Sequence, residues 1–248
     1  MRWKKEDIEL IKSNYFEKGD YNLSKILSCS PNAVRIMASR LGVSRLKQRE
    51  TVELTDTEEQ IVLGSLMGDM YCRIKSSCKN AQLEEGHGRS QDSYLTWKAS
   101  LLRSLSSGLR RIKSGGLFYE SGAYPCLNYY HKLFYGNGRK EINQAILKKL
   151  DKLGIAIWYM DDGTYKKRDK ASCLHTNGFS YEENLLIKEW FENKWHIFPK
   201  IHSVRKPKEY PGRVWHYLSF GVKETPKLFN LIENYIHPSM KYKIGVYT

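Results

Sequence analysis

Two apolar helices that each end in an acidic turn constrain this chain more than any other feature of its sequence. They are predicted at residues 60–70 (QIVLGSLMGDM) and 153–164 (LGIAIWYMDDGT), and their aspartates, Asp69 and Asp162, stand about 93 residues apart. The same order of predicted elements follows each helix, which indicates an internal repeat. Two copies in one chain imply a pseudo-twofold monomer, the intramolecular analogue of a symmetric dimer.

The elements after each motif helix are basic strand-like segments, a helix, further strand-like stretches and a closing amphipathic helix. The later helices are predicted at residues 93–105 and 141–150 in the first half, and at 181–195 and 225–235 in the second. The later strand-like stretches are predicted at residues 116–129, 200–204 and 214–222. The predicted unit is therefore αββαββα, present twice, and the chain belongs to the α+β class.

A small all-α module precedes the repeat. Residues 1–45 show apolar positions at helical spacing and predict three short helices, with Ser30-Pro31 opening the third and Gly42 closing it. That helix turns Asn32, Arg35 and Arg40 outward, the layout of a helix-turn-helix recognition helix. A helical hairpin for protein contacts is the alternative. The predicted domains are 1–45 (helix-turn-helix), 46–56 (linker), 57–150 (first half) and 151–248 (second half).

Charge and cysteine content narrow the function classes. Lys and Arg number 41 against 27 acidic residues, a net charge of +14, which favours a polyanionic partner because neutralising phosphates releases counterions. The five cysteines show no CxxC pairing, which argues against a disulfide framework or a structural zinc site. No apolar run approaches a membrane span, and the N-terminus has no signal core. We expect a soluble, intracellular protein, cytoplasmic unless it is encoded in an organelle.

The paired motif acids indicate metal chemistry. Gly64 and Gly68 lie on one face of the first motif helix and would let the second approach closely, which would bring Asp69 and Asp162 together. Two carboxylates at helix C-termini repel each other and the helix dipoles. Divalent cations would compensate them, and hard oxygen ligands suit Mg²⁺, which can activate water against a phosphodiester.

At these residues the sequence resembles the LAGLIDADG homing endonucleases, in the subgroup whose second motif reads WYMDDG. LGSLMGDM and IAIWYMDDGT resemble the two signature helices, and YHKLFYGNGRKEI, LHTNGFSYEE and IHPSMKYKI match further segments in the same order. The resemblance covers about residues 55–248. It implies a tandem fold with saddle-shaped DNA-binding sheets, and a single-chain, metal-dependent enzyme that makes a double-strand break in a long, asymmetric DNA site.

The resemblance also assigns roles to residues. It places the motif carboxylates on Asp69 and Asp162 and the basic active-site lysines on Lys140 and Lys243, with Asp161 in a supporting position. A lysine near the scissile phosphate would neutralise developing charge or polarise a water. The first motif departs from the family pattern at Met70, where Gly is usual. We expect this change to be tolerated, because the metal is bound through Asp69; reduced activity in that half is the alternative.

Basic residues that alternate with apolar ones predict a DNA-binding surface, because a two-stranded ribbon with one cationic face fits the major groove. Few acidic partners are expected there. The candidates in the first half are Arg73, Lys75, His87 and Arg89. The candidates in the second half are Lys166, Lys167, Arg168, Lys170, Lys200, His202, Arg205, Lys206, Arg213 and His216.

Three functions remain open from the sequence. The first is a homing endonuclease that acts on double-stranded DNA with Mg²⁺, as a monomer. The second is a maturase on the same scaffold, with intron RNA as its partner, because basic grooves also serve RNA. The third is an inactive DNA-binding regulator. Both motif acids are present, which favours the enzyme.

Overall fold

The computed structural model describes residues 3–43, 51–76, 78–105, 107–205 and 214–246. It divides into two compact units, Met1–Glu53 and Leu54–Thr248. Of the positions singled out in the sequence, Lys206, Arg213 and residues 46–50 of the predicted linker lie outside the described residues. In the described ranges, every helix is too short or too polar to cross a membrane.

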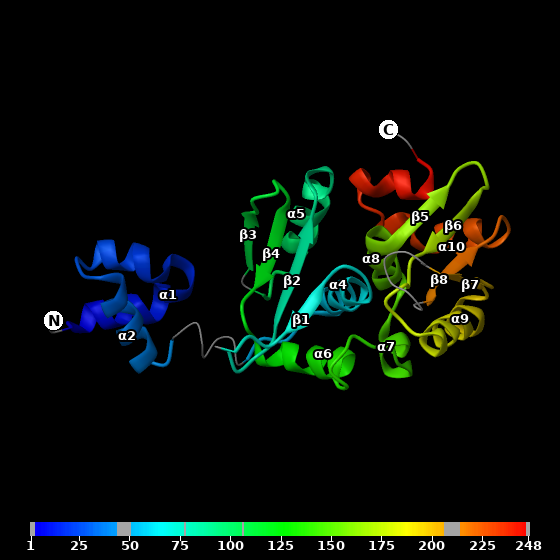
Figure 1. The fold of residues 1–248 in the computed structure, drawn as a ribbon. Coiled ribbons are helices and arrows are strands. Elements are labelled where there is room, and N and C mark those ends of the chain that lie inside the picture. Colours follow the sequence, from blue (N-terminus) through cyan, green and yellow to red (C-terminus); the bar gives the residue numbers. More distant parts are fainter. Residues whose placement is uncertain (1–2, 44–50, 77, 106, 206–213, 247–248) are drawn as a thin grey trace. The chain divides into compact units, whose positions relative to one another are not determined.

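The N-terminal unit contains α1 (Lys5–Ile26) and α2 (Pro31–Arg40) (Figure 1). The backbone leaves the helical conformation at Gly19 (φ 71°, ψ 173°), so α1 consists of two helical segments and the unit has the three that were predicted. Ser30 caps α2 by accepting a hydrogen bond from the Ala33 amide at 3.2 Å. A small core that includes Ile11, Leu23 and Val34 holds the segments together.

The C-terminal unit repeats one αββαββα pattern, as predicted. The first copy comprises α4 (Asp56–Met67), β1 (Tyr71–Arg73), β2 (Gln82–His87), α5 (Asp92–Leu101), β3 (Ser107–Arg111), β4 (Leu117–Ser121) and α6 (Pro125–Tyr135). The second comprises α8 (Lys152–Asp162), β5 (Gly163–Lys166), β6 (Ala171–Leu174), α9 (Tyr181–Trp195), β7 (Lys200–Arg205), β8 (Val214–Phe220) and α10 (Glu224–Ile232). The short elements are α7 (Gln144–Lys149) between the copies and the 3-10 turns η1 (Arg89–Gln91), η2 (Glu233–Tyr235) and η3 (Pro238–Ile244).

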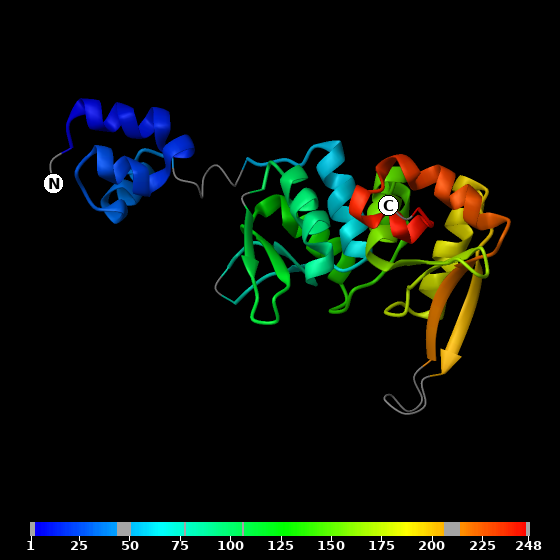
Figure 2. The same cartoon turned by 90° about the horizontal axis from the view of Figure 1, so that it is seen from above.

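The two sheets have matching topology. Each has four antiparallel strands, in the order β1-β2-β4-β3 in the first half and β5-β6-β8-β7 in the second. Figure 2 shows the β7–β8 pair, in yellow and orange, extending past the helices of its own half. The fold is therefore the predicted α+β tandem.

The sequence reading was wrong in the second part of the first half. Residues 125–129 were taken as strand, but they begin α6, and the predicted closing helix at 141–150 is only the short connector α7. Pro125 occupies the first turn of α6, where a missing amide costs nothing. The buried side chains Leu127, Tyr130 and Phe134 then recur at helical spacing. β3 was not predicted.

The motif helices α4 and α8 pack side by side between the two sheets (Figure 1). Both are buried around most of their circumference, which explains why their sequences are apolar without a clear polar stripe. A Cβ added to Gly64 would lie only 2.3 Å from the Gly154 carbonyl oxygen, so the helices approach backbone to backbone at this pair. The predicted close approach is confirmed, with Gly154 as the unforeseen second glycine.

Candidate active site and nucleic-acid interface

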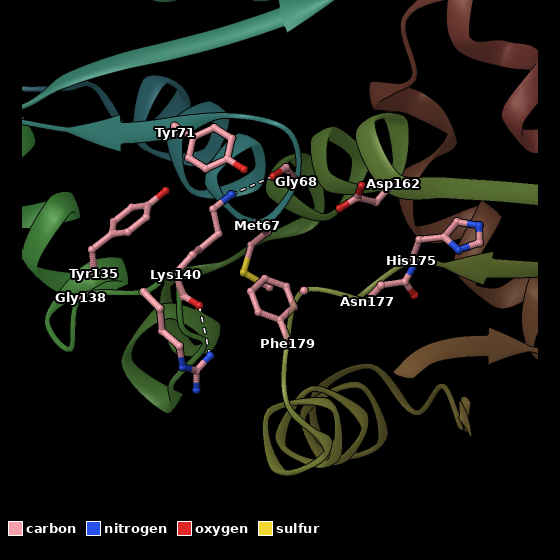
Figure 3. Close-up of a pocket in the computed structure, with 12 residues that line it drawn as sticks. Met67, Gly68, Tyr71, Tyr135, Gly138, Lys140, Asp162, His175, Asn177 and Phe179 are labelled. Carbon is pink, nitrogen blue, oxygen red and sulfur yellow. Dashed lines mark hydrogen bonds between the residues drawn. The ribbon is translucent and has the colours of Figure 1, made fainter. Parts of the chain in front are cut away.

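The C-terminal ends of the two motif helices meet at one place and carry the motif acids there. α4 ends at Met67, and Asp69 follows with 45% of its side chain exposed. α8 ends with Asp161, which is buried, and Asp162, which is half-buried. Asp162 and Gly68 both line a pocket of about 680 Å³ that Figure 3 shows in close-up.

The two predicted lysines lie at these helix ends. The Lys140 ammonium donates to the carbonyl oxygens of Gly68 and Met70, both at 2.9 Å, and Figure 3 marks the bond to Gly68. The Lys243 ammonium donates to the Asp161 carbonyl oxygen at 2.8 Å. Carbonyls at a helix C-terminus lack partners within the helix, and cations are favourable there. A lysine ammonium therefore binds the C-terminal end of each motif helix, next to the motif aspartate.

Burial and neighbouring charges shift the pKa values of the ionisable groups at the site. Burial, followed by the charges of Asp161 and Asp69, raises the pKa of Asp162 to about 7. Burial lowers the pKa of Lys140 to about 8, despite the nearby carboxylates. A carboxyl group that is this hard to ionise marks a site where a further positive charge would be stabilising.

The donor set fits a hard divalent cation. Asp69 and Asp162 supply carboxylate oxygens, and the backbone carbonyls of the helix ends lie beside them, which are the ligand types that Mg²⁺ takes together with water. Asp69, His87 and Asp161 also each offer a ligand atom within 4.8 Å of the others. His87 and Asp161 are buried and hydrogen-bonded to other side chains, whereas Asp69 is exposed and lies 4.0 Å from His87 Nδ1, so it is the accessible member of the three.

His87 does not face a groove, contrary to prediction. Its side chain is 2% exposed, its Nε2 meets Glu85 Oε1 at 2.6 Å and its Nδ1 meets Gln91 Oε1 at 2.8 Å. Burial lowers the pKa of His87, but the hydrogen bond and charge of Glu85 outweigh it and raise that pKa. The strand register explains the placement, because His87 pairs with Leu117 and both point to the covered side of the first sheet.

A buried charge network joins His87 to the second motif. Lys98 of α5 donates to Glu85 Oε1 at 2.5 Å and to both oxygens of Asp161, at 3.0 and 3.1 Å. The Tyr94 hydroxyl donates to Asp161 Oδ1 at 2.7 Å. Sequence reasoning assigned Asp161 a supporting place but missed its partners, because a lysine in the middle of a helix gives no signal of burial.

The open face of the first sheet is less cationic than predicted. Arg73 pairs with Glu84 at 2.6 Å, and Lys75 pairs with Glu84 and Glu120, both at 3.0 Å. Glu84 and Glu120 stand opposite each other on β2 and β4, so acidic partners are not scarce here. Arg89 lies in η1, outside the strands, and its Nε donates to the Gly115 carbonyl oxygen.

Arg110 was not among the candidates. It stacks over the Phe118 ring at 4.5 Å, on the same open face as Arg73. The basic run around Arg110 in the sequence, LRRIK, was the signal that could have marked it.

The open face of the second sheet keeps its positive charge. The register places Lys166, Lys200 and His202 on one face, and all three are exposed. The His202 ring stacks on Tyr217 with ring centroids 5.3 Å apart. The exposed cations Lys167, Arg168 and Lys170 lie in the turn that follows β5, where Arg168 pairs with Asp169 at 3.1 Å.

Two candidates of the second half lie on the other face. Arg205 and His216 alternate away from Lys200 and His202, and the His216 ring meets Tyr181 of α9 edge to face at 5.4 Å. His216 therefore packs against the helical layer, which corrects its predicted place. In the N-terminal unit, Asn32, Arg35 and Arg40 are exposed on α2 as expected, with Arg35 Nε 3.3 Å from Asp20.

Comparisons with known proteins agree with this geometry. Residues 59–228 match the model of the LAGLIDADG DNA endonuclease family. Protein RecA of Mycobacterium gastri is 30% identical over 199 residues, which cover 77% of this chain and 48% of the relative. The chain thus spans about half the length of the RecA relatives that it matches.

Two other relatives are named as a maturase and as a probable endonuclease. Cytochrome b mRNA maturase bI2 of Debaryomyces hansenii is 29% identical, over 76% of this chain and 73% of the relative. Probable intron-encoded DNA endonuclease 3 of Mycosarcoma maydis is 33% identical, over 45% of this chain and 80% of the relative. Among solved structures, the homing endonuclease I-WcaI bound to its DNA recognition sequence has a similar fold, with a TM-score of 0.67 at 19% identity, covering 85% of this chain and 97% of the other.

Proposed function

The chain belongs to the LAGLIDADG DNA endonuclease family, and from this membership we propose that it makes a double-strand break at a specific, long, asymmetric site in double-stranded DNA. The observation that carries the proposal is the meeting of two motif acids and two lysines at the paired helix ends. Two nearly matched half-sites suit the cutting of two strands. The proposed enzyme acts as a monomer, because one chain supplies both halves.

Asp69 and Asp162 would hold the divalent cations, which we propose to be Mg²⁺. Bound there, the cations would activate water and stabilise the leaving oxygen of the phosphodiester. The Asp162 carboxyl group, whose pKa burial and neighbouring acids raise to about 7, would lose its proton when a cation binds. Metal binding and proton release would therefore be coupled at this residue.

Lys140 and Lys243 would supply positive charge next to the scissile phosphates. Each ammonium is held by backbone carbonyls rather than by a carboxylate. Such a lysine is not neutralised by an ion pair, and in its protonated form it would stabilise the charge that develops on phosphate oxygens in the transition state. The open sheet faces would position the duplex, with Lys166, Lys200 and Arg110 as contacts for phosphates or base edges.

In vitro selection tests this function. The chain is incubated with a randomised DNA library and Mg²⁺, and cleaved molecules are sequenced. A single long consensus without internal symmetry is expected, and it should be lost with Asp162→Asn. Recovery of no cleaved sequence above the level of that variant would refute the proposed function.

A maturase is the second candidate, because a relative named as an mRNA maturase aligns with 76% of this chain. The exposed cations of the second sheet suit RNA as well as DNA. Competition separates the two: the selected DNA site should displace intron RNA at equal concentration if DNA is the substrate. Preferential retention of the RNA would favour the maturase.

A further inference from the structure

The side chain of Asp161, a residue of the second half, lies against the first half of the molecule. Gly68 precedes Asp69 as Asp161 precedes Asp162, so the two residues occupy matching places in the repeat. A Cβ added to Gly68 would lie 2.6 Å from Asp161 Cβ and 2.8 Å from its Oδ2. Asp161 thus fills the space that a side chain at position 68 would need, on the side of the first half.

Two buried hydrogen-bond donors of the first half, both on α5, bind this carboxylate. The Tyr94 hydroxyl and the Lys98 ammonium both reach Asp161, and the side chains of Lys98 and Asp161 are 1% and 0% exposed. Glu85 and His87 complete the network from β2. Two carboxylates, one ammonium and one imidazole are therefore in contact, and each of these side chains is at most 2% exposed.

A buried network of charges contributes little net free energy to folding. Desolvating the charges offsets much of their attraction, and apolar replacements are often neutral or stabilising. Its strength lies in geometry, because charge-assisted bonds from two fixed donors leave Asp161 one position. Asp161 is joined by a single peptide unit to Asp162, so its position also sets that of the neighbouring acid.

We propose that Lys98 is a positioning residue: through Asp161 it fixes the end of α8 against the first half and so sets the spacing of the Asp69 and Asp162 carboxylates. This inference rests on the proposed nuclease function. Tyr94 shares the task, and Glu85 orients the Lys98 ammonium from the opposite side. Tyr94, Lys98 and Glu85 belong to the first half, whereas the acceptor Asp161 belongs to the second.

A paired substitution separates positioning from packing. Lys98→Met leaves Glu85 and Asp161 buried without their ammonium, so the free energy of unfolding should fall. Lys98→Met combined with Glu85→Gln also removes the buried Glu85 charge, so stability should recover in part, while Asp161 still lacks its ammonium. If Lys98 only supports the core, cleavage recovers with stability. If Lys98 positions Asp161, cleavage stays low, because Asp161 has lost two of its bonds.

Three measurements on the full chain decide the matter: urea unfolding, DNA affinity in Ca²⁺, and single-turnover cleavage in Mg²⁺ at saturating protein. For the double variant we expect stability between that of Lys98→Met and that of wild type, near wild-type affinity, and cleavage slowed by about 100-fold, the cost of a small displacement of reacting groups. Tyr94→Phe, which keeps the core shape, should slow cleavage less and in the same way. Lys188→Met, which breaks a surface pair with Glu192 at 2.7 Å, is the matched control and should change nothing.

The inference is overturned if the double variant, or Tyr94→Phe where the double variant does not fold, cleaves at the wild-type rate. It is also overturned if cleavage falls only in proportion to lost folded protein. Failure of the proposed function looks different: wild-type protein would then cleave no better than Asp162→Asn, whatever the Lys98 variants do.

Discussion

At the scale of single residues, the protonation of Asp162 depends on its burial and on the acids around it. In the metal-free protein, burial and the neighbouring acids raise its pKa from the ordinary 3.8 to about 7. Between these values the folded chain binds a proton that the unfolded chain has lost. The contribution of Asp162 to the free energy of unfolding is therefore full at low pH and decreases as the pH rises through this range.

Asp162→Asn should remove this dependence. In urea unfolding with EDTA, the difference in stability between the variant and wild type should shift in favour of the variant as the pH rises toward 7. Saturating Mg²⁺ should reduce the shift, because the cation compensates the ionised carboxylate. Parallel pH profiles for both proteins in EDTA would contradict the raised pKa.

At the scale of elements, the α4–α8 contact depends on glycine. Gly64→Ala adds a Cβ only 2.3 Å from the Gly154 carbonyl oxygen, and backbone cannot move aside as a side chain does. Alanine has a higher helix propensity than glycine, so without this contact the substitution would raise the free energy of unfolding. We expect a loss of about 1–3 kcal/mol in the free energy of unfolding, typical of overpacking. Gly221→Ala, whose Cβ would meet open space, is the control; equal effects of the two variants would refute the close approach.

The two sheets should respond differently to salt. Lys200 is an exposed cation on the open face of the second sheet, and Lys200→Ala should make the salt dependence of DNA binding shallower by about one unit of slope. Glu120 restrains Lys75 on the first sheet, so Glu120→Gln should make that dependence steeper. Dissociation constants measured in Ca²⁺ over a range of salt concentrations test both. A steeper slope for Lys200→Ala would contradict the assigned face.

The sequence predicted the elements whose signals are local. Ser180 and Glu183 form a capping box at the start of α9, and the predicted helix at 181–195 matches it to the residue. The places of His87 and His216 depend on strand register, and the pairing of Arg73 with Glu84 depends on which strands are neighbours. The burial of Lys98 depends on a carboxylate from the other half. Such features follow from tertiary packing, which local patterns do not encode.

At the scale of the whole molecule, the N-terminal unit is a second candidate DNA-binding module. Its α2 exposes Asn32, Arg35 and Arg40, and the unit is joined to the nuclease fold by a short stretch of chain. A tethered module makes the second binding event intramolecular and raises avidity without altering the chemistry. We propose that it extends the DNA contact at one end of the site.

A chain that begins at Glu53 should therefore cut at the same position but bind more weakly and protect a shorter footprint. In the full chain, Arg35→Ala should weaken binding by about 1–3 kcal/mol, with sequence dependence at that end only, if the side chain reads a base. Footprinting and affinity measurements on both proteins provide the test. An unchanged footprint and affinity for the shortened chain would favour protein contacts for this module.

The central claim is that Asp69 and Asp162 jointly hold the catalytic cations of one double-strand cleavage site. Its most direct measurement compares wild type, Asp69→Asn and Asp162→Asn on the selected DNA, with binding assayed in Ca²⁺ and cleavage of each strand assayed in Mg²⁺. We predict that both variants bind the site as wild type does and that neither makes the double-strand break. Cleavage of both strands at the wild-type rate by either variant would contradict the account.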